Sequence, residues 1–132
     1  MRERWKHSKT CVYNCGYHLI WCPKYCRPVL VDGVDDRLKT LLLEKAKEIH
    51  VEIEQMEIMP DHVHLFVRST PTNSPHCIVG WLKGYTSHML RKEFACLRSK
   101  LPTLWTRGYY VETVGHISEK TIRNYIEDQK KR

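Results

Sequence analysis

Hydrophobic and polar residues alternate along this chain with periods that change several times, and each change predicts a different element. The apolar and aromatic residues of 11–21 predict a first strand. An Asp-Gly turn follows, and apolar residues at helical spacing over 35–50 predict a helix. Residues 51–59 and 62–67 then alternate with period two about a Pro-Asp pair, which predicts a β-hairpin.

The second half of the chain repeats the change from helix to strand and then adds one more helix. A loop rich in Pro, Ser and Asn over 70–75 precedes a helix predicted from Ser74 to about Arg98. Residues 106–114 predict the last strand, and residues 117–131 predict a final helix. The order βαββαβ plus one helix predicts an α+β fold, a ferredoxin-like or RRM-like antiparallel sheet with two helices on one face.

Strict alternation also assigns faces within the predicted hairpin. In the second strand, Val63, Leu65 and Val67 face one side, whereas His62 and His64 face the other together with Phe66. In the first strand, the residues predicted to share a face are Val51, Ile53, Gln55, Glu57 and Met59.

The length of the chain and its pattern of apolar runs predict one domain of 132 residues. Its core is expected over about 11–114 and the final helix over about 117–131. No apolar run approaches the roughly 18 residues that cross a bilayer, and the first residues lack the apolar segment of a secretory signal. A cytoplasmic protein with no membrane partner is therefore expected.

Positive charge is concentrated at the two ends of the chain. The net charge of +7 divides into +5 for residues 1–28, −4 for residues 29–74 and +6 for residues 75–132. Such asymmetry predicts a polyanion as partner, and nucleic acid is the commonest polyanion.

Six cysteines in a chain expected to be cytoplasmic argue against a disulfide scaffold. The spacings Cys11-x3-Cys15 and Cys22-x3-Cys26 raise structural zinc as an alternative. On an extended strand, however, four residues span about 13 Å, which is too far for two thiolates to share one ion. Ordinary buried or half-buried thiols are the preferred interpretation.

Two pairs of polar residues carry the candidate chemistry. His62 and His64 lie two apart on a predicted strand, so their side-chain bases are about 7 Å apart and both rings can reach one metal ion if a third ligand completes the site. Tyr125 and Gln129 lie four apart on the final helix and share one face. Each pair also has a simpler interpretation, namely a polar strand face that meets water and a tyrosine that only packs.

Taken together, the two pairs support phosphoryl chemistry. Two imidazoles and the amide oxygen of Gln129 suit a hard divalent cation, Mg²⁺ or Mn²⁺, with positions open for water and a phosphate oxygen. Tyr125 would lie beside that phosphate, and the cation would help to activate a hydroxyl whose ordinary pKa is about 10. A phosphotyrosine conserves the energy of the broken bond. No phosphate-binding loop motif is present, so no nucleotide cofactor is expected.

Three segments, in this order, carry a family resemblance: PDHVHLFV, LWTRGYYVETVG and the Tyr125-x3-Gln129 pair. They resemble the single-tyrosine HUH transposases of very small bacterial and archaeal insertion sequences. The resemblance implies that Tyr125 is the nucleophile and that His62, His64 and Gln129 are the metal ligands. It further implies a single-stranded DNA substrate with hairpins at the transposon ends and a 5′-phosphotyrosine intermediate. It implies a homodimer in which the tyrosine helix of one subunit completes the site of the other.

Five basic residues are predicted to contact the DNA backbone, namely Lys24, Arg27, Lys83, Arg107 and Arg123. Three alternatives remain open. Residues 107–114 partly match an RRM signature, which would make the chain a non-catalytic module for single-stranded nucleic acid. The chain can also be a domesticated relative of the transposases, or a basic α+β domain with a structural metal.

Overall fold

A computed structural model describes residues 6–7, 12–13, 15–113 and 119–131. The strands are β1 (Lys6–His7), β2 (Val12–Tyr13), β3 (Cys15–Trp21), β4 (Glu52–Met59), β5 (His62–Ser69) and β6 (Tyr110–Thr113). The helices are the 3₁₀ turn η1 (Lys24–Cys26), α1 (Val34–Glu48), α2 (Pro75–Glu93), α3 (Ala95–Lys100) and α4 (Glu119–Lys130). None of these helices is long and apolar enough to cross a membrane.

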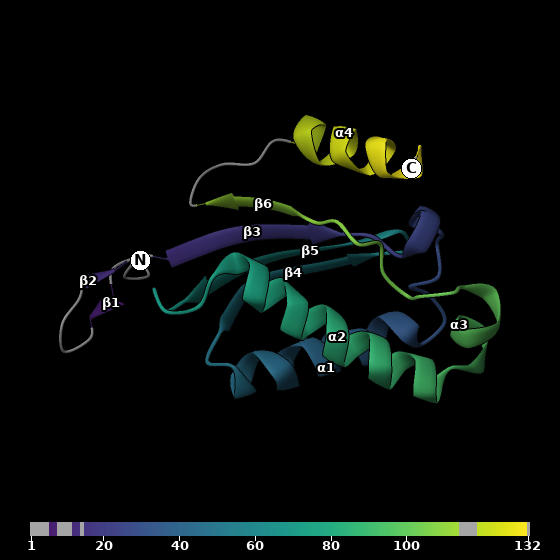
Figure 1. Ribbon diagram of the computed structural model, residues 1–132, viewed down its shortest axis with the longest axis horizontal. Helices are drawn as coiled ribbons and strands as arrows, with labels where there is room; N and C mark the ends of the chain where they lie inside the picture. Colours follow the sequence, from purple (N-terminus) through teal and green to yellow (C-terminus); the bar gives the residue numbers. More distant parts are fainter. Residues whose placement is uncertain (1–5, 8–11, 14, 114–118, 132) are drawn as a thin grey trace.

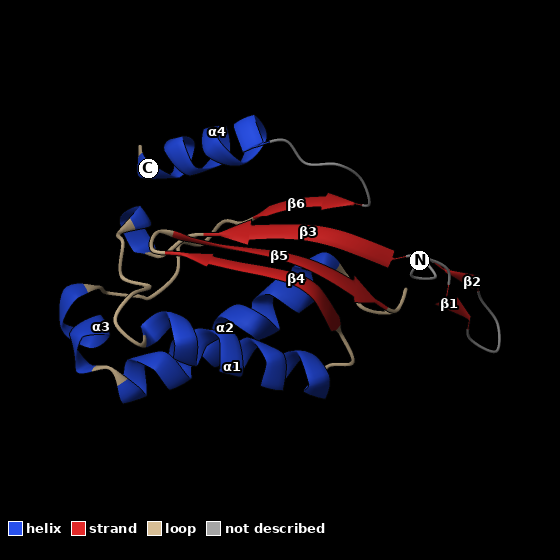
Figure 2. Cartoon of the chain, turned by 180° about the vertical axis from the view of Figure 1, so that it is seen from behind, coloured by secondary structure: helices blue, strands red, loops and turns tan. Residues whose placement is uncertain are grey.

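The main sheet has the strand order β4-β5-β3-β6, and every neighbouring pair is antiparallel. Helices α1 and α2 cover one face of this sheet, and α4 lies on the opposite side (Figure 1). The same three layers are seen from behind in Figure 2. The βαββαβ order and the antiparallel α+β sheet predicted from the sequence are therefore confirmed. The small two-stranded sheet of β1 and β2 was not predicted.

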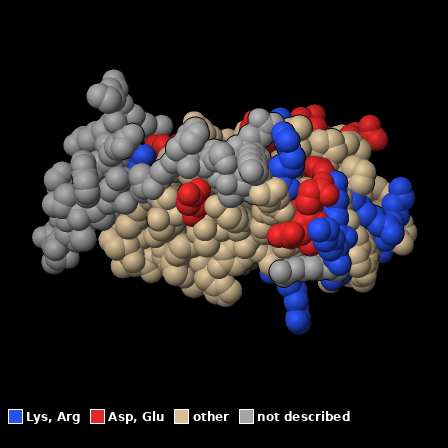
Figure 3. All heavy atoms as spheres, turned by 90° about the horizontal axis from the view of Figure 1, so that it is seen from above, with Lys and Arg blue, Asp and Glu red and all other residues tan. Residues whose placement is uncertain are grey.

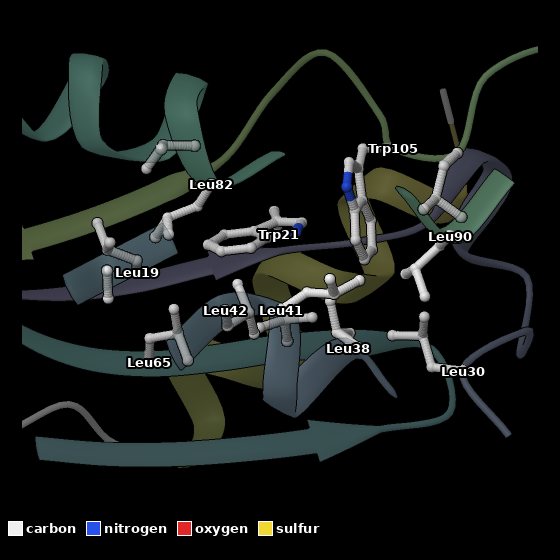
Figure 4. Packing of buried hydrophobic residues seen from close by; sticks show 14 of the residues in the cluster. Leu19, Trp21, Leu30, Leu38, Leu41, Leu42, Leu65, Leu82, Leu90 and Trp105 are labelled. Carbon is white, nitrogen blue, oxygen red and sulfur yellow. The ribbon is translucent and has the colours of Figure 1, made fainter. Parts of the chain in front are cut away.

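The core fills the space between the sheet and helices α1 and α2. Inward side chains of β3 and β5 meet the leucines of both helices, as the close view of Figure 4 shows. The fully buried members include Leu19, Trp21, Leu65, Leu38, Leu41, Leu42 and Leu82. Burying one such side chain contributes roughly 1.5–3 kcal/mol, so this layer supplies most of the stability of the sheet platform.

The predicted alternation of β4 is wrong in its first half because the strand contains a register shift between Ile53 and Gln55. One extra residue in a bulge reverses the face of everything before it. Ile53 therefore points into the core with Met56, whereas Gln55 pairs with Phe66 on the other face. A local sequence pattern does not reveal where such an insertion lies.

The second predicted helix ends five residues early, because α2 stops at Glu93 and Phe94 has extended backbone angles. A separate short helix follows, and Leu97 buries itself against the core. The Arg98 guanidinium donates to the carbonyls of Arg91 and Lys92 at the end of α2. This side chain caps the orphan carbonyls that an interruption of the helix creates.

Two other predicted boundaries also differ from those in the structure. The last strand covers only Tyr110–Thr113, so residues 106–109, predicted as strand, form a loop. The final helix begins at Glu119, and the predicted cap Ser118 lies outside the described residues, as do 114 and Gly115. The predicted first strand is described only from Val12, in β2 and β3.

Candidate functional site

Strand β5 presents His62 and His64 on the face of the sheet that α1 and α2 leave open. Its residues alternate in burial, with Val63 and Leu65 fully buried in the core and His62 and His64 half-buried on the opposite face. The antiparallel register places Ile20 of β3 and Glu57 of β4 on either side of His64. The predicted pairing of the two histidines on one face is thus present in the fold.

Each of the two histidines has one ring nitrogen oriented by a carboxylate. Asp61 Oδ1 lies 2.8 Å from His62 Nδ1, and Glu57 Oε2 lies 3.5 Å from His64 Nδ1. Burial lowers the pKa of His64, and the hydrogen bond to Glu57 opposes that shift. A neutral imidazole whose Nδ1 faces a carboxylate keeps Nε2 for another partner, as in carboxylate–histidine metal centres.

A third histidine, His18 of β3, joins this group and was missed in the sequence. Its Nδ1 lies 3.3 Å from His64 Nε2, and its ring lies 4.7 Å from that of Phe66. His18 is 8% exposed. The alternating strand 15–21 indicates its face, but only the pairing of β3 with β5 brings it beside His64.

Helix α4 brings the predicted nucleophile to the same face. The ring of Tyr125 packs edge-on against Tyr110, with centroids 5.7 Å apart. Tyr110 pairs with Ile20, which in turn pairs with His64, so all of these side chains share one side of the sheet. The hydroxyl oxygen of Tyr125 is buried in this arrangement.

Gln129, the predicted third ligand, lies one helical turn beyond Tyr125 and is 8% exposed. It lines a cavity of about 160 Å³, and the other lining residues are Lys24, Tyr25, Thr106, Arg107 and Gly108. A Cβ atom on Gly108 would lie 3.9 Å from Gln129 Oε1, so the amide oxygen faces this loop. The histidine pair and the Tyr125–Gln129 pair therefore share a face, while Gln129 is directed toward the loop between Trp105 and β6.

The turn before β5 also lies near the last turn of α4. Burial is the main cause that raises the pKa of the Cys22 thiol, and the charge of Asp61 raises this pKa further while that of Lys130 lowers it. Cys22 forms a small buried cluster with Cys26 and with Ile126 of α4, so this thiol lies beside the helix that carries the tyrosine.

Comparison with known proteins identifies the family. The profile of the family described as Transposase IS200 like matches residues 11–129, which is most of the chain. The chain belongs to the IS200-like transposase family.

Two relatives of this IS200-like transposase are similar over most of their length. The ISDra2 transposase TnpA of Deinococcus radiodurans is 39% identical over 126 residues, which cover 94% of this chain and 90% of that protein. The transposase for insertion sequence element IS200 of Salmonella typhimurium is 34% identical over 119 residues, covering 89% and 78%.

Solved structures agree with the fold of the transposase. A crystal structure from Deinococcus radiodurans R1, of a protein assigned as a transposase, has a TM-score of 0.87 at 38% identity and covers 94% of this chain and 97% of that chain. A REP-associated tyrosine transposase bound to a REP hairpin has a TM-score of 0.60 over 92% of this chain and 68% of that chain. At 13% identity, the second likeness concerns the fold alone.

Four of the five basic residues predicted to contact DNA lie on the surface of the transposase. Arg27, Arg107 and Arg123 are exposed, and Lys24 is half-buried beside the cavity. Seen from the side of α4, Lys and Arg side chains gather at one end of the molecule, with acidic side chains among them (Figure 3). The charge on this face is therefore mixed as well as basic.

Lys83 differs from the other four, because its ammonium group is directed into the protein. It donates to the carbonyl oxygens of Thr106, Arg107 and Gly108, at 2.5, 3.4 and 3.2 Å. Burial lowers the pKa of Lys83 to about 8. These bonds favour a role in ordering the loop that lines the cavity over the predicted contact with DNA.

The two described cysteines of the second C-x3-C spacing meet, contrary to the separation expected for an extended strand. Strand β3 ends at Trp21, and η1 turns the chain so that the thiols of Cys22 and Cys26 interact. Burial raises the pKa of both. Among the described residues, no group of three His, Cys, Asp or Glu side chains could hold a metal. Cys11, in the first spacing, lies outside them.

Proposed function

We propose that this transposase cleaves and rejoins single-stranded DNA at the ends of an insertion sequence, with Tyr125 as the nucleophile. One observation carries the proposal: the helix that bears Tyr125 and Gln129 packs on the sheet face that presents His62 and His64. For a member of the IS200-like family, the shared face of Tyr125 and the two histidines supports these proposed roles.

The residues of the site fit a divalent metal, Mg²⁺ or Mn²⁺. His62 and His64 each have Nδ1 beside a carboxylate, so Nε2 would be the ligand atom, and at His64 a metal would replace the present contact between Nε2 and His18 Nδ1. The amide oxygen of Gln129, which faces the loop of Gly108 in this structure, is the third protein ligand in this proposal once α4 has moved. When bound, the metal offsets negative charge on the scissile phosphate.

The chemistry of Tyr125 is a direct transfer. Its oxygen loses a proton and forms a bond to the phosphorus, while the bond from phosphorus to the 3′ oxygen breaks and that oxygen takes up a proton. The products are a 5′-phosphotyrosine and a free 3′-hydroxyl. Rejoining is the reverse attack by a 3′-hydroxyl, so no nucleotide cofactor is required.

Helix α4 has to move for this attack, because the hydroxyl oxygen of Tyr125 is buried where the helix now packs. A homodimer offers a way to achieve this movement, since the tyrosine helix of one copy can complete the histidine site of the other. Hairpin DNA at the transposon ends is the proposed substrate, and membership of the IS200-like transposase family supports this choice. Lys24, Arg27, Arg107 and Arg123 are the proposed backbone contacts.

A denaturing gel tests the proposal. The transposase is incubated with Mg²⁺ and a labelled single-stranded oligonucleotide that carries the cognate element end. We expect a covalent adduct with the wild-type chain and none with Tyr125→Phe, because only the hydroxyl is lost, while binding in a gel-shift assay is retained. Tyr110→Phe is the matched control, and its adduct should persist because Tyr110 lies on the sheet.

Two results would contradict the proposal in different ways. An adduct that persists in Tyr125→Phe assigns the chemistry to another residue. Binding of the cognate end with no adduct from the wild-type chain instead favours the non-catalytic binding module. An adduct formed by a chain whose gene has no element ends around it indicates the domesticated relative, with the same chemistry.

A further inference from the structure

The 3₁₀ turn η1 holds an aromatic side chain in an unusual conformation at the edge of the cavity. Tyr25 has φ of 61° and Cys26 has φ of 49°, so two consecutive residues that are not glycine adopt the left-handed region. Such residues are uncommon there and persist only where their surroundings fix them. Tyr25 is nevertheless 50% exposed, so burial of its ring does not explain the conformation of the turn.

Contacts of the two neighbours of Tyr25, Lys24 and Cys26, hold the turn in this conformation. Cys26 is buried against α4, with its thiol 3.8 Å from the carbonyl oxygen of Ile126, and its amide donates to the carbonyl of Pro23 at 2.8 Å. The amide of Lys24 donates to the carbonyl of Leu104, also at 2.8 Å. The backbone is therefore anchored on both sides of Tyr25, and the anchored turn directs its ring outward.

Two cations lie over the exposed ring of Tyr25. Lys24 Nζ lies 5.3 Å from the centroid of Tyr25, and Arg27 Cζ lies 5.9 Å from it. Arg107, on the loop held by Lys83, lines the same cavity. An exposed ring beside several positive charges matches the way proteins hold single-stranded nucleic acid, in which a base stacks on an aromatic side chain and cations meet the backbone.

The cavity has the size of one aromatic ring. Its volume is about 160 Å³, and a cavity of about 150 Å³ is known to take up benzene. Tyr25 forms one wall, and Gln129 forms another. With α4 in its present position, a base seated against Tyr25 would therefore lie beside Gln129, which we propose as a metal ligand.

We propose that Tyr25 is a stacking platform for one nucleobase of the single-stranded DNA, at a nucleotide next to the scissile phosphate. Lys24 and Arg107 hold the phosphate of that nucleotide. The inference rests on the proposed function, because it assumes that the reacting DNA passes Gln129. Stacking on Tyr25 would position the single-stranded DNA so that its scissile phosphate meets Tyr125.

Binding of a labelled oligonucleotide is measured by fluorescence anisotropy in the Tyr125→Phe background, where no covalent bond forms. Tyr25→Asn removes the ring but tolerates the left-handed backbone. We expect this change to weaken binding about tenfold, within the roughly 5- to 150-fold range of one lost base stack. The conservative change Tyr25→Phe should restore most of the affinity. Trp81→Ala, which removes another exposed ring from α2 on the far side of the sheet, should have no effect.

A cross-link tests the position of the base. Oligonucleotides carry 5-iododeoxyuridine at one position at a time around the cleavage site, and irradiation is followed by peptide mapping. We expect a covalent link to Tyr25 from only one or two positions beside the scissile phosphate. A free mononucleotide at the same concentration should neither cross-link nor compete, because the backbone contacts need a strand.

These assays separate the two proposals. Unchanged binding by Tyr25→Asn, with no cross-link to Tyr25, overturns the stacking role even if the wild-type chain forms its adduct. A cross-link to Tyr25, together with no adduct from the wild-type chain on its cognate end, retains the stacking role and rejects the cleavage chemistry. Equal weakening by Tyr25→Phe and Tyr25→Asn also overturns stacking, since the ring would not be what matters.

Discussion

Replacing Lys83 by Met is expected to loosen the loop that lines the cavity while leaving the core intact. The Lys83 ammonium contributes three hydrogen bonds to the carbonyls of residues 106–108, one short and two long. Methionine keeps an unbranched stem of similar length and removes only the charged donor. Because α2 carries Lys83 and the loop carries Arg107, the change breaks the polar tie between helix and loop.

The expected loss is about 1–3 kcal/mol of unfolding free energy. A hydrogen bond from a charged donor contributes roughly 1.5–3 kcal/mol when buried. Two of the three bonds are long, and Lys83 is only half-buried, so solvent screening reduces the total. For a domain of this size, a loss of about 2 kcal/mol lowers Tm by roughly 6–10 °C.

Urea unfolding followed by tryptophan fluorescence measures the stability, and the salt dependence of DNA binding identifies the reason. If Lys83 contacted a DNA phosphate, Lys83→Met would reduce the slope of log K against log salt by about 0.7 for a single strand. If Lys83 only orders the loop, stability falls and the slope is unchanged. A reduced slope with unchanged stability would refute the reasoning. Arg107→Met is the matched control and should reduce the slope.

The pH dependence of the same variant provides a second measurement. Burial lowers the pKa of Lys83 to about 8 in the folded state, whereas a free lysine keeps its proton to about pH 10.4. Between these values the unfolded chain binds more protons, so folding stability rises with pH. The wild-type chain should therefore gain stability relative to Lys83→Met as pH rises from 8 to 10.

The other predictions concern the metal and a buried hydrogen bond. Chelation of divalent cations should abolish the DNA adduct on a denaturing gel, and adding Mg²⁺ or Mn²⁺ should restore it. An adduct that survives chelation would show that the mechanism needs no metal. Thr86→Val should cost about 1–3 kcal/mol, because Trp105 Nε1 donates to the fully buried Thr86 hydroxyl at 3.1 Å and would lose its acceptor. Thr86→Ser keeps that acceptor, so urea unfolding should find it the more stable variant, and the reverse order would contradict this account.

Sequence periodicity predicted the architecture well because the fold is built from local patterns. Period two in β5 and helical spacing in α1 are set by each segment's own burial, so they can be read without knowledge of their neighbours. The wrong predictions concern structural features that depend on strand pairing or on a single residue. The composition of each segment does not reveal the bulge at Ile53 or the break of the helix at Phe94.

The site was predictable in part, for a related reason. His62 and His64 lie on one strand and Tyr125 and Gln129 lie on one helix, so spacing alone paired them. His18 joined them only through strand register, which no local pattern encodes. A charge count made Lys83 a DNA contact, because counting does not reveal that three carbonyls lie within reach of its ammonium group.

The way α4 is fastened has a consequence for how the enzyme can work. Outside the main core, a small cluster of Cys22, Cys26 and Ile126, with the ring of Tyr125 beside it, joins the helix to the sheet and η1. Burying one isoleucine contributes roughly 1.5–3 kcal/mol, so detaching the helix costs only a small multiple of that energy. The ferredoxin-like platform would keep its own core throughout. Under the proposed mechanism, the helix that bears Tyr125 can therefore change its position, even between two molecules, while the sheet and its core stay folded.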